Sequence, residues 1–429
     1  MGRHMTATDG IGVRTQHAVS GPAPPGIPRI HPPSPKLNER RPLGAYGLTF
    51  RMLEPASLTE AEEAGVIQLL RLAFNGGPGW FDLPVAQIDH FRWKLADYPY
   101  ESFAYLGEFG AEIVGFGGRL NRRWLVNGLE RVGRDGVEAA LHPRYQNQGL
   151  TTLRRDIFDE FDYSEGFTLS FASHPSSLHN RRKRGTPSVA NPMENLVRPL
   201  DVGRHIHPQH MANGATGASS RTRIALERGR TRQQRPEVVR RLAWEWRLLR
   251  HRLQHRPLHF RAGGWTIRTV DAFDQRIEAF FTDAATQFDL IQVRNQRFLN
   301  YRYADRRAGP FTIRLAEAEG QILGYSVVRA TSDSGVLADL LALPGREDVA
   351  DALIKDALTL ARQAGAPSVR TWMMRHHPYH RLLVHAGFMQ NQSIVEPGYE
   401  AKHMDPVELE FLADPQARVH IVIGDTDHV

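Results

Sequence analysis

The sequence of 429 residues contains no cysteine. This absence excludes a disulfide framework, thiolate zinc sites and cysteine nucleophiles. The sequence also has no apolar run near the 18 residues of a membrane span, and its N-terminus lacks the apolar core of a signal peptide. We therefore expect a cytoplasmic, soluble protein with no membrane partner.

Basic residues are abundant: the formal net charge is +7 and arginine supplies most of the excess. Such a balance favours polyanionic partners, which include phosphate-bearing small molecules and nucleic acid. Hydrophobic residues make up 41% of the chain, enough to fill sizeable cores. At roughly 100–200 residues per domain, the length predicts two or three domains.

The N-terminal stretch predicts no regular structure. Met1 to His4 resemble a tag remnant, and we take Met5 as the natural start. From Ser20 to Leu43 the chain is rich in proline, which can continue neither a helix nor a sheet ladder. We interpret residues 1–45 as a disordered arm.

The first ordered region is predicted over residues 46–200. Apolar residues at helical spacing indicate a helix over Thr59–Phe74. The remaining expected elements are strands at Phe103–Gly107, Glu112–Arg119 and Gly136–Leu141, a helix at Leu150–Phe161 and a strand at Phe167–Ser173. This order predicts the α/β class, with a mixed sheet covered by helices.

Residues 201–263 are predicted to link two regions. Asp201 to Arg235 has few large apolar groups, and Pro236 suits the first turn of a helix. In that arginine-rich helix, apolar side chains recur at spacings of three and four. The spacing predicts a buried stripe of Val239, Leu242, Trp246, Leu249 and Leu253.

A second region over residues 264–429 echoes the first. Its expected elements are strands at Phe311–Ala316, Gln321–Ala330, Gly335–Leu341 and Ser368–Met374, and helices at Asp348–Ala364 and up to His385. Phe91–Asp97 resembles Leu299–Asp305, and Glu112–Phe116 resembles Gln321–Tyr325, at nearly the same separation in both halves. We infer a divergent internal repeat.

The segment after the strand Gly136–Leu141 carries the most informative motif. Pro143 ends the strand pairing, and a tight turn then leads into a helix. Backbone N–H groups at such a helix N-terminus bind phosphate readily, and a glycine lets the ligand approach closely. The candidate ligand-binding residues are Leu141, Gln146, Asn147, Gln148, Gly149, Leu150 and Thr151.

This motif resembles the acyl-CoA signature of the GNAT (GCN5-related N-acetyltransferase) superfamily. Leu141, Pro143, Gln146 and Gly149 match the pattern, whereas Thr151 stands where Gly or Ala is usual. Asn180 matches an asparagine that often bonds the CoA arm in this family, and Gly387-Phe388 matches a characteristic ending. The resemblance covers residues 46–200 and 264–405 and implies two tandem GNAT-like domains joined by the arginine-rich helix.

The second copy lacks the phosphate loop, because its equivalent region reads Leu343 to Asp348 without the Gln-x-x-Gly pattern. We predict that it binds acyl-CoA poorly or not at all. It would instead shape the acceptor site or a dimer interface.

The resemblance also implies candidate catalytic residues. In this family a neutral amine attacks the CoA thioester directly, and a base removes the proton. The family's glutamate position falls at Asp135, with Glu138 as second choice, and for each the alternative is a solvated carboxylate. The usual acid, a tyrosine, is missing before Gly185. The candidate substitutes for this acid are Ser176, His174 and His179. The alternative is a mechanism that needs no acid from the protein.

The predicted function is an acyl-CoA-dependent N-acyltransferase, with acetyl-CoA as donor and a small-molecule amine as acceptor. One alternative is an aminoacyl-tRNA-dependent transferase of the Fem type, because the arginine-rich stretch from Arg221 to Arg256 suits a phosphate backbone. Another is a non-catalytic acyl-CoA-binding module. A homodimer is an option, and no metal is expected, since His205, His207 and His210 have no carboxylates to complete a site.

Overall fold

The structure is a computed structural model of the full chain. It describes residues 37–43, 47–74, 76–146, 166–172, 175–206, 237–255, 258, 260, 263–391 and 395–426. Most of the predicted N-terminal arm, the predicted helix Leu150–Phe161 and most of the predicted linker before Glu237 lie outside these residues.

The first half contains the predicted helix and strands. α1 (Glu60–Ala73) begins at a capping box, in which the Thr59 hydroxyl accepts from the Glu62 N–H and the Glu62 carboxylate accepts from the Thr59 N–H. The other elements are β1 (Arg41–Leu43), β2 (Leu48–Leu53), η2 (Pro55–Ser57), η3 (Gly79–Asp82), α2 (Gln87–Leu95), β3 (Ser102–Phe109), β4 (Glu112–Val126), β5 (Leu129–Leu141), η4 (Pro143–Tyr145), β6 (Gly166–Ala172), α4 (Pro175–Lys183) and β7 (Met193–Pro199).

β4 and β5 are longer than the sequence predicted, because they form one long hairpin. The turn is Asn127-Gly128, and both residues have positive φ, 49° and 78°. Asn-Gly is the favoured pair for a two-residue hairpin turn of this type. The dipeptide was therefore a readable signal for the extended strands.

The second half repeats the order of the first. Its elements are α5 (Val202–His205), α8 (Glu237–Gln254), β8 (Thr266–Val270), α9 (Arg276–Ala285), β9 (Leu290–Gln292), α10 (Gln296–Leu299), η5 (Asn300–Ala304), η6 (Arg306–Ala308), β10 (Phe311–Ala318), β11 (Gln321–Ala330), β12 (Gly335–Ala342), α11 (Glu347–Gln363), β13 (Ser368–Met374), α12 (His380–His385), β14 (Met389–Gln390), β15 (Glu396–Lys402), η7 (Pro406–Ala413), β16 (Val419–His420) and η8 (Ile423–Asp425). The predicted strands at 321–330 and 368–374 have the predicted bounds.

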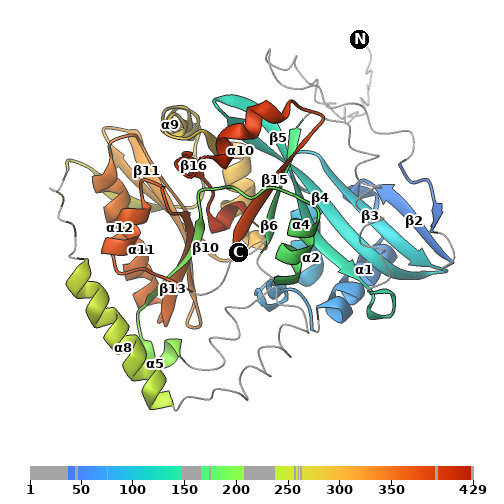
Figure 1. The fold of residues 1–429 in the computed structure, drawn as a ribbon, viewed down its shortest axis with the longest axis horizontal. Coiled ribbons are helices and arrows are strands. Elements are labelled where there is room, and N and C mark those ends of the chain that lie inside the picture. Colours follow the sequence, from blue (N-terminus) through green and yellow to red (C-terminus); the bar gives the residue numbers. More distant parts are fainter. Residues whose placement is uncertain are drawn as a thin grey trace, which may run out of the picture.

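The two halves exchange strands between two mixed sheets, which stand side by side in Figure 1. The first sheet runs β1-β2-β3-β4-β5-β6-β15, and β9 and β16 extend it from β4. The second runs β14-β7-β13-β12-β11-β10-β8. β7 thus leaves the first half to pair with β13, and β15 leaves the second half to pair with β6. Each sheet depends on a strand from the other half.

The repeated segments meet at the junction of the halves. Trp93 and Tyr301 occupy equivalent positions in the two repeats, and their rings stack at a centroid distance of 4.9 Å. The Trp93 indole donates to the Tyr301 carbonyl (2.9 Å), and the Tyr301 hydroxyl donates to the Lys94 carbonyl (3.3 Å). One hydrophobic core extends across both sheets, from Trp124 and Phe167 to Tyr325 and Met374. The sheets therefore share an interior.

The prediction of a buried stripe on the arginine-rich helix is wrong. α8 lies at the lower left edge of the molecule in Figure 1. The predicted stripe is exposed: Val239 43%, Leu242 58%, Trp246 68%, Leu249 49% and Leu253 75%. Its opposite face packs on the protein through Leu248. Helical periodicity identifies an apolar face but does not say whether the fold covers it.

Candidate active site

β5 and β6 are parallel neighbours that separate along their length. They pair only from Val132 with Gly166 to Arg134 with Thr168, although β5 continues to Leu141 and β6 to Ala172. Beyond the paired residues, Gly136 and Ala139 of β5 are exposed. A central strand beside a parallel neighbour is usually buried on both faces. The exposed positions mark an opening beside the central strand of the first sheet.

A β-bulge lies at this opening. Glu138 and Ala139 of β5 stand opposite the single residue Gly117 of β4, because Val137 pairs with Gly118 and Ala140 with Phe116. Glu138 has a φ of 51°, which is uncommon for a residue other than glycine. Such a bulge interrupts the ladder and redirects backbone groups. Strained backbone of this kind clusters at functional sites.

The second half has the same strand separation, but it is filled. β12 and β13 pair only at Gly335 with Val369 and Val336 with Arg370, and every residue of β12 is buried. The C-terminal segment, residues 419–426, contacts both strands. The Tyr379 hydroxyl accepts from the Ala342 N–H (2.9 Å) and donates to the Ala342 carbonyl (3.0 Å). The protein itself thus occupies the second opening.

A buried ionic network fixes the C-terminal segment there. Arg294 lies 3.2 Å from Asp339 of β12 and 2.8 Å from Asp425 of η8, and all three side chains are almost fully enclosed. The Tyr325 hydroxyl donates to Asp339 at 3.0 Å. Burial alone would raise the pKa of Asp339, but the Arg294 guanidinium outweighs it, and the pKa is lowered to about 2. Arg294 therefore joins β12 to the end of the chain.

Two buried histidines complete the network. The Tyr379 N–H donates to Nδ1 of His377, so the other ring nitrogen of His377 donates to Nδ1 of His420, 2.9 Å away. The Nε2 of His420 then carries a proton and lies 3.8 Å from Asp339. Burial lowers the pKa of both imidazoles below the ordinary value, which keeps them neutral.

The predicted cofactor-binding residues are only partly described. β5 ends at Leu141, η4 follows, and the Gln146 side chain donates to the Leu141 carbonyl at 3.0 Å. This contact turns the chain sharply at the end of β5, next to the opening. Asn147, Gln148, Gly149, Leu150 and Thr151 lie outside the described residues.

The equivalent turn of the second half is unsuited to phosphate. α11 starts with Glu347 and Asp348 in its first turn, and Asp348 is paired with Arg346 at 2.9 Å. Acidic side chains at a helix N-terminus satisfy the helix dipole and repel a phosphate. The structure thus supplies a physical reason for the predicted weak acyl-CoA binding of this half, which itself stays a prediction.

The two predicted base candidates both lie on β5, each with a partner. Asp135 is buried and accepts from the Arg122 guanidinium at 2.9 Å. Glu138 accepts from the Trp80 indole at 2.6 Å and forms an ion pair with Lys94. Sequence reasoning did not include Trp80 and Lys94 in the site. The only signal was that Lys94 belongs to the repeated segment Phe91–Asp97.

Glu138 and Asp339 are equivalent positions of the repeat, since each lies five residues before a proline, Pro143 or Pro344. Both are buried acidic residues with a cationic partner. Asp339 is enclosed with the C-terminal segment, whereas Glu138 lies between the exposed positions Gly136 and Ala139. The same carboxylate position therefore borders an opening in one half only.

α4 carries the remaining predicted site residues. His179 is exposed on this helix, and the side chains of Ser176 and Asn180 are outside the described part of the structure. Arg181, which sequence reasoning gave no role, is buried and donates to the carbonyls of Ser170 (2.9 Å) and Glu396 (2.6 Å). Burial lowers the pKa of Arg181. The hydrogen bonds of the Arg181 side chain hold α4 against β6 and the exchanged strand β15.

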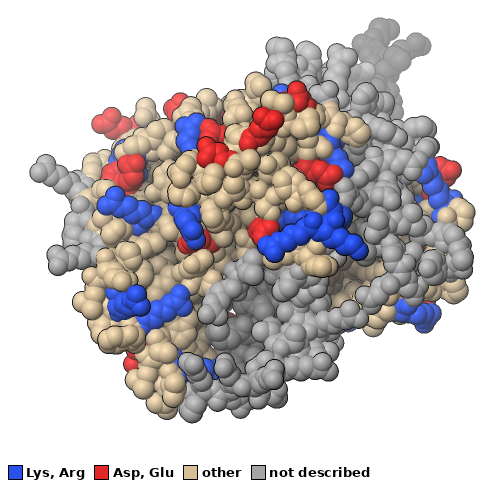
Figure 2. Space-filling view, in the orientation of Figure 1, with Lys and Arg blue, Asp and Glu red and all other residues tan. Residues whose placement is uncertain are grey.

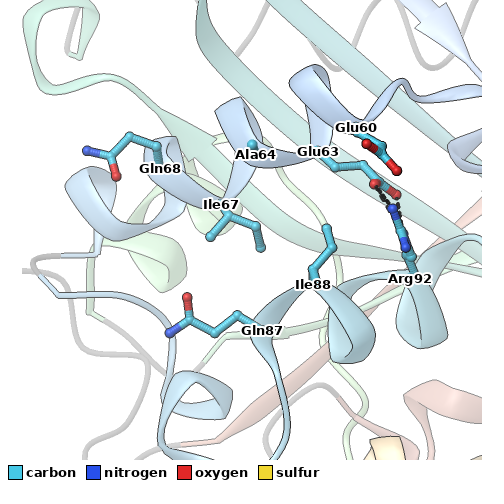
Figure 3. A pocket seen from close by; sticks show the side chains of 8 residues that line it. All are labelled: Glu60, Glu63, Ala64, Ile67, Gln68, Gln87, Ile88 and Arg92. Atoms are coloured by element: carbon cyan, nitrogen blue, oxygen red, sulfur yellow. Dashed lines mark hydrogen bonds and ion pairs between the residues drawn. The ribbon is translucent and has the colours of Figure 1, made fainter.

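The described residues also line a groove between α1 and α2, with a volume of about 430 Å³. Figure 3 shows Ile67 and Ile88 facing each other, with the Glu63–Arg92 ion pair at one end and Gln68 and Gln87 at the other. None of its lining residues comes from β5, β6 or the turn at Gln146. The groove is separate from the opening described above.

The described helices include none that is long and apolar enough to cross a membrane. His205 is buried and lies against the ring of Trp244, whereas His207 and His210 are outside the described residues.

No protein-family model matches the sequence, and neither does any curated protein. Solved structures do match. Saccharomyces cerevisiae N-myristoyltransferase with bound myristoyl-CoA aligns with a TM-score of 0.52 and 13% identity over 90% of this chain and 88% of that one. The structure of the same yeast enzyme with myristoyl-CoA and inhibitors aligns with a TM-score of 0.51 and 14% identity, over 94% of this chain and 92% of that one. A protein of unknown function from Enterococcus faecalis V583, described as a probable N-acyltransferase, aligns with a TM-score of 0.49 and 12% identity. The alignment covers 83% of this chain and 73% of that one.

The yeast structures align over both halves, and at these low sequence identities the alignment shows a shared fold only. The chain therefore has a tandem GNAT-like fold, the fold of N-myristoyltransferase.

Proposed function

We propose that this protein is an acyl-CoA-dependent N-acyltransferase whose reaction takes place in the first half. The observation that carries the proposal is the open stretch of β5 at Gly136 and Ala139, beside the predicted phosphate-binding turn. A turn at the end of a strand holds the phosphates, and the separated strand then offers backbone groups to an extended acyl-CoA arm. The fold shared with structures that bind myristoyl-CoA supports this assignment.

The chemistry follows from the bulge. The amine nitrogen attacks the thioester carbonyl, the new C–N bond forms, and the C–S bond breaks to release the CoA thiolate. The bulge at Glu138 and Ala139 redirects the backbone of β5. A backbone N–H group at the opening would polarise the carbonyl oxygen as it gains negative charge. The ammonium proton passes to a base, and the thiolate takes up a proton from water or a protein acid.

We assign the base to Glu138 in preference to Asp135. Asp135 is held by two nitrogens of Arg122, at 3.2 and 2.9 Å, away from the bulge. Glu138 is part of the bulge itself, next to exposed Ala139. Lys94 and Trp80 would hold its carboxylate in place for the proton transfer.

Acetyl-CoA remains the proposed donor and a small amine the proposed acceptor, in the cytoplasm. The direct test measures thiol release from acetyl-, octanoyl- and myristoyl-CoA with a panel of amines. Because the chain contains no cysteine, a thiol reagent reports only the CoA product. Amine-dependent thiol release is expected with at least one donor.

Binding is measured in parallel by thermal shift with acyl-CoA, CoA and tRNA. A true ligand stabilises the folded chain by RT ln(1 + [L]/Kd). Absence of both a shift and thiol release with every acyl-CoA would refute the proposal. A shift with tRNA alone would favour the aminoacyl-tRNA alternative, and a shift without turnover would favour the non-catalytic module.

A further inference from the structure

α8 is attached to the protein by one face only. Leu248 is buried, and the Trp244 ring meets the ring of buried His205 at a centroid distance of 4.9 Å. The Arg247 guanidinium donates to the Gln390 carbonyl. Further along this face, the rings of His255 and His385 meet at 5.7 Å. These contacts hold the helix on the protein from Trp244 to His255.

The opposite face carries an apolar stripe exposed to solvent. At about 100° per residue, its six members fall within an arc of about 100°. The members are Val238 (67% exposed), Val239 (43%), Leu242 (58%), Trp246 (68%), Leu249 (49%) and Leu253 (75%). Single exposed apolar residues are ordinary, but a contiguous patch usually marks a binding surface.

Cations border this stripe on both sides. On the helical wheel Arg241 and Arg252 lie along one edge, with Glu245 between them and the stripe, and Arg250 lies along the other edge. The helix carries five arginines and two glutamates, a net charge of +3, and one of those glutamates, Glu245, is paired with Arg241 at 2.9 Å. Figure 2 shows basic side chains at the lower left, where α8 lies in Figure 1. The helix is amphipathic and basic.

We propose that α8 docks this protein on an anionic lipid surface. A helix that lies in the membrane interface buries an apolar face among the acyl chains and places arginines at the level of the headgroups. Tryptophan, here Trp246, is favoured at that interface. With this charge α8 cannot span a bilayer, so it would lie flat on the surface. The sequence-based expectation of no membrane partner rested on the absence of a membrane span and of a signal peptide, and neither bears on a helix that lies on the surface with its apolar stripe exposed.

The charge pattern favours lipid over a second copy of the chain. Two α8 helices that paired antiparallel through their stripes would align the Arg241 and Arg252 edge with the same edge of the partner. Like charges would then face each other across the seam. An anionic membrane neutralises the same cations, each of which contributes about 1 kcal/mol near such a surface, or about a fivefold change in affinity.

The test is sedimentation of the full chain with vesicles of phosphatidylcholine alone and of phosphatidylcholine mixed with phosphatidylglycerol. Binding is expected to the mixed vesicles, at least roughly tenfold tighter than to the neutral ones, and to weaken with salt. The triple variant Leu242→Glu, Trp246→Glu, Leu253→Glu should lose binding. The triple variant Arg241→Gln, Arg250→Gln, Arg252→Gln should weaken binding on the order of 100-fold.

Leu129→Glu is the matched control, because Leu129 is 57% exposed at the β4–β5 turn, on another element. It should bind vesicles like the parent chain. All altered side chains are exposed, so melting temperatures should stay unchanged, and this is checked for each variant. The proposal is overturned if the parent chain stays in solution with both vesicles, or if the Glu variant still binds. It is also overturned if the parent chain is a dimer that the Glu variant dissociates, which would assign the stripe to a second copy.

Discussion

The two halves share a strand order and a separated strand pair, yet one pair is open and the other is filled. In the first half, β5 exposes Gly136 and Ala139. In the second, β12 is buried throughout and the C-terminal segment is joined to it by Arg294. The fold alone therefore does not make a ligand site, because the same geometry is also satisfied by the chain's own residues.

The difference also suggests how the repeat diverged in role. A carboxylate at the equivalent positions Glu138 and Asp339 is kept in both halves. In the first half it borders the opening, and in the second it anchors a structural network.

Exchange of each carboxylate for its amide separates the roles most strongly. Glu138→Gln should lower kcat by about 10²–10⁴-fold, the usual contribution of a positioned base, and leave acyl-CoA affinity nearly unchanged. Asp339→Asn should instead lower stability. Steady-state kinetics and denaturant unfolding of both variants measure the contrast. Equal kinetic losses in the two variants would remove the distinction between the halves.

Removal of Arg294 tests the filled half. Arg294→Ala leaves Asp339 and Asp425 buried without their cation, so the free energy of unfolding should fall by about 3–5 kcal/mol. Arg418→Ala is the control, since the ion pair of Arg418 with Asp289 is largely exposed and should contribute less than about 1 kcal/mol. Urea unfolding compares them. Similar losses would mean that the network does not hold the C-terminal segment.

Acid should weaken the second half before the carboxylates titrate. The pKa values of His377 and His420 in the folded chain lie below 6.5, so the unfolded chain takes up protons first as pH falls. Stability is then complete above about pH 6.5 and declines below it, by up to about 1.4 kcal/mol per pH unit for each histidine.

Melting temperatures between pH 8 and pH 5 check this decline. His377→Gln should remove about half of the decline, because glutamine does not titrate and His420 remains. His179→Gln, at an exposed position, should leave the profile as it is. A profile that is already flat in the parent chain would contradict the assignment of two neutral buried imidazoles.

Arg181 tests the exchanged strand at the open half. Arg181→Ala leaves the carbonyls of Ser170 and Glu396 without this donor, which should destabilise the chain by about 1–3 kcal/mol. Hydrogen exchange should increase mainly in β6 and β15. An equal increase in hydrogen exchange across both sheets would indicate that Arg181 does not act locally.

Local patterns in the sequence predicted most of the elements. The apolar spacing of α1 and the strand-like runs of β11 and β13 are short-range signals, and the order of such elements gave the class. The resemblance of Phe91–Asp97 to Leu299–Asp305 gave the repeat. The exchange of β7 and β15 was not predictable in this way, because the residue pattern of a strand does not determine which strand it pairs with. The exposed stripe on α8 was missed for the same reason, since periodicity carries no information on what covers a face.

The candidate site was predictable only in part. The proline and the Gln-x-x-Gly pattern placed the turn after β5, and the family resemblance gave Asp135 as the first choice of base and Glu138 as the second. Trp80 and Lys94 come from η3 and α2, distant in sequence, and only the folded chain brings them to Glu138. Likewise, no local sequence pattern in residues 419–426 predicted that they fill the second opening.

The most direct test of the central claim is the binding stoichiometry of acyl-CoA by isothermal titration. One molecule is expected to bind per chain. Binding should be lost in Gly149→Asp, which places bulk and negative charge at the predicted phosphate turn. A comparable change in the turn of the second half, Gly345→Asp, at a glycine with a φ of 73° that an aspartate tolerates, should leave binding intact. Two molecules per chain, or binding that survives Gly149→Asp and is lost in Gly345→Asp, would contradict an open first half and a filled second half.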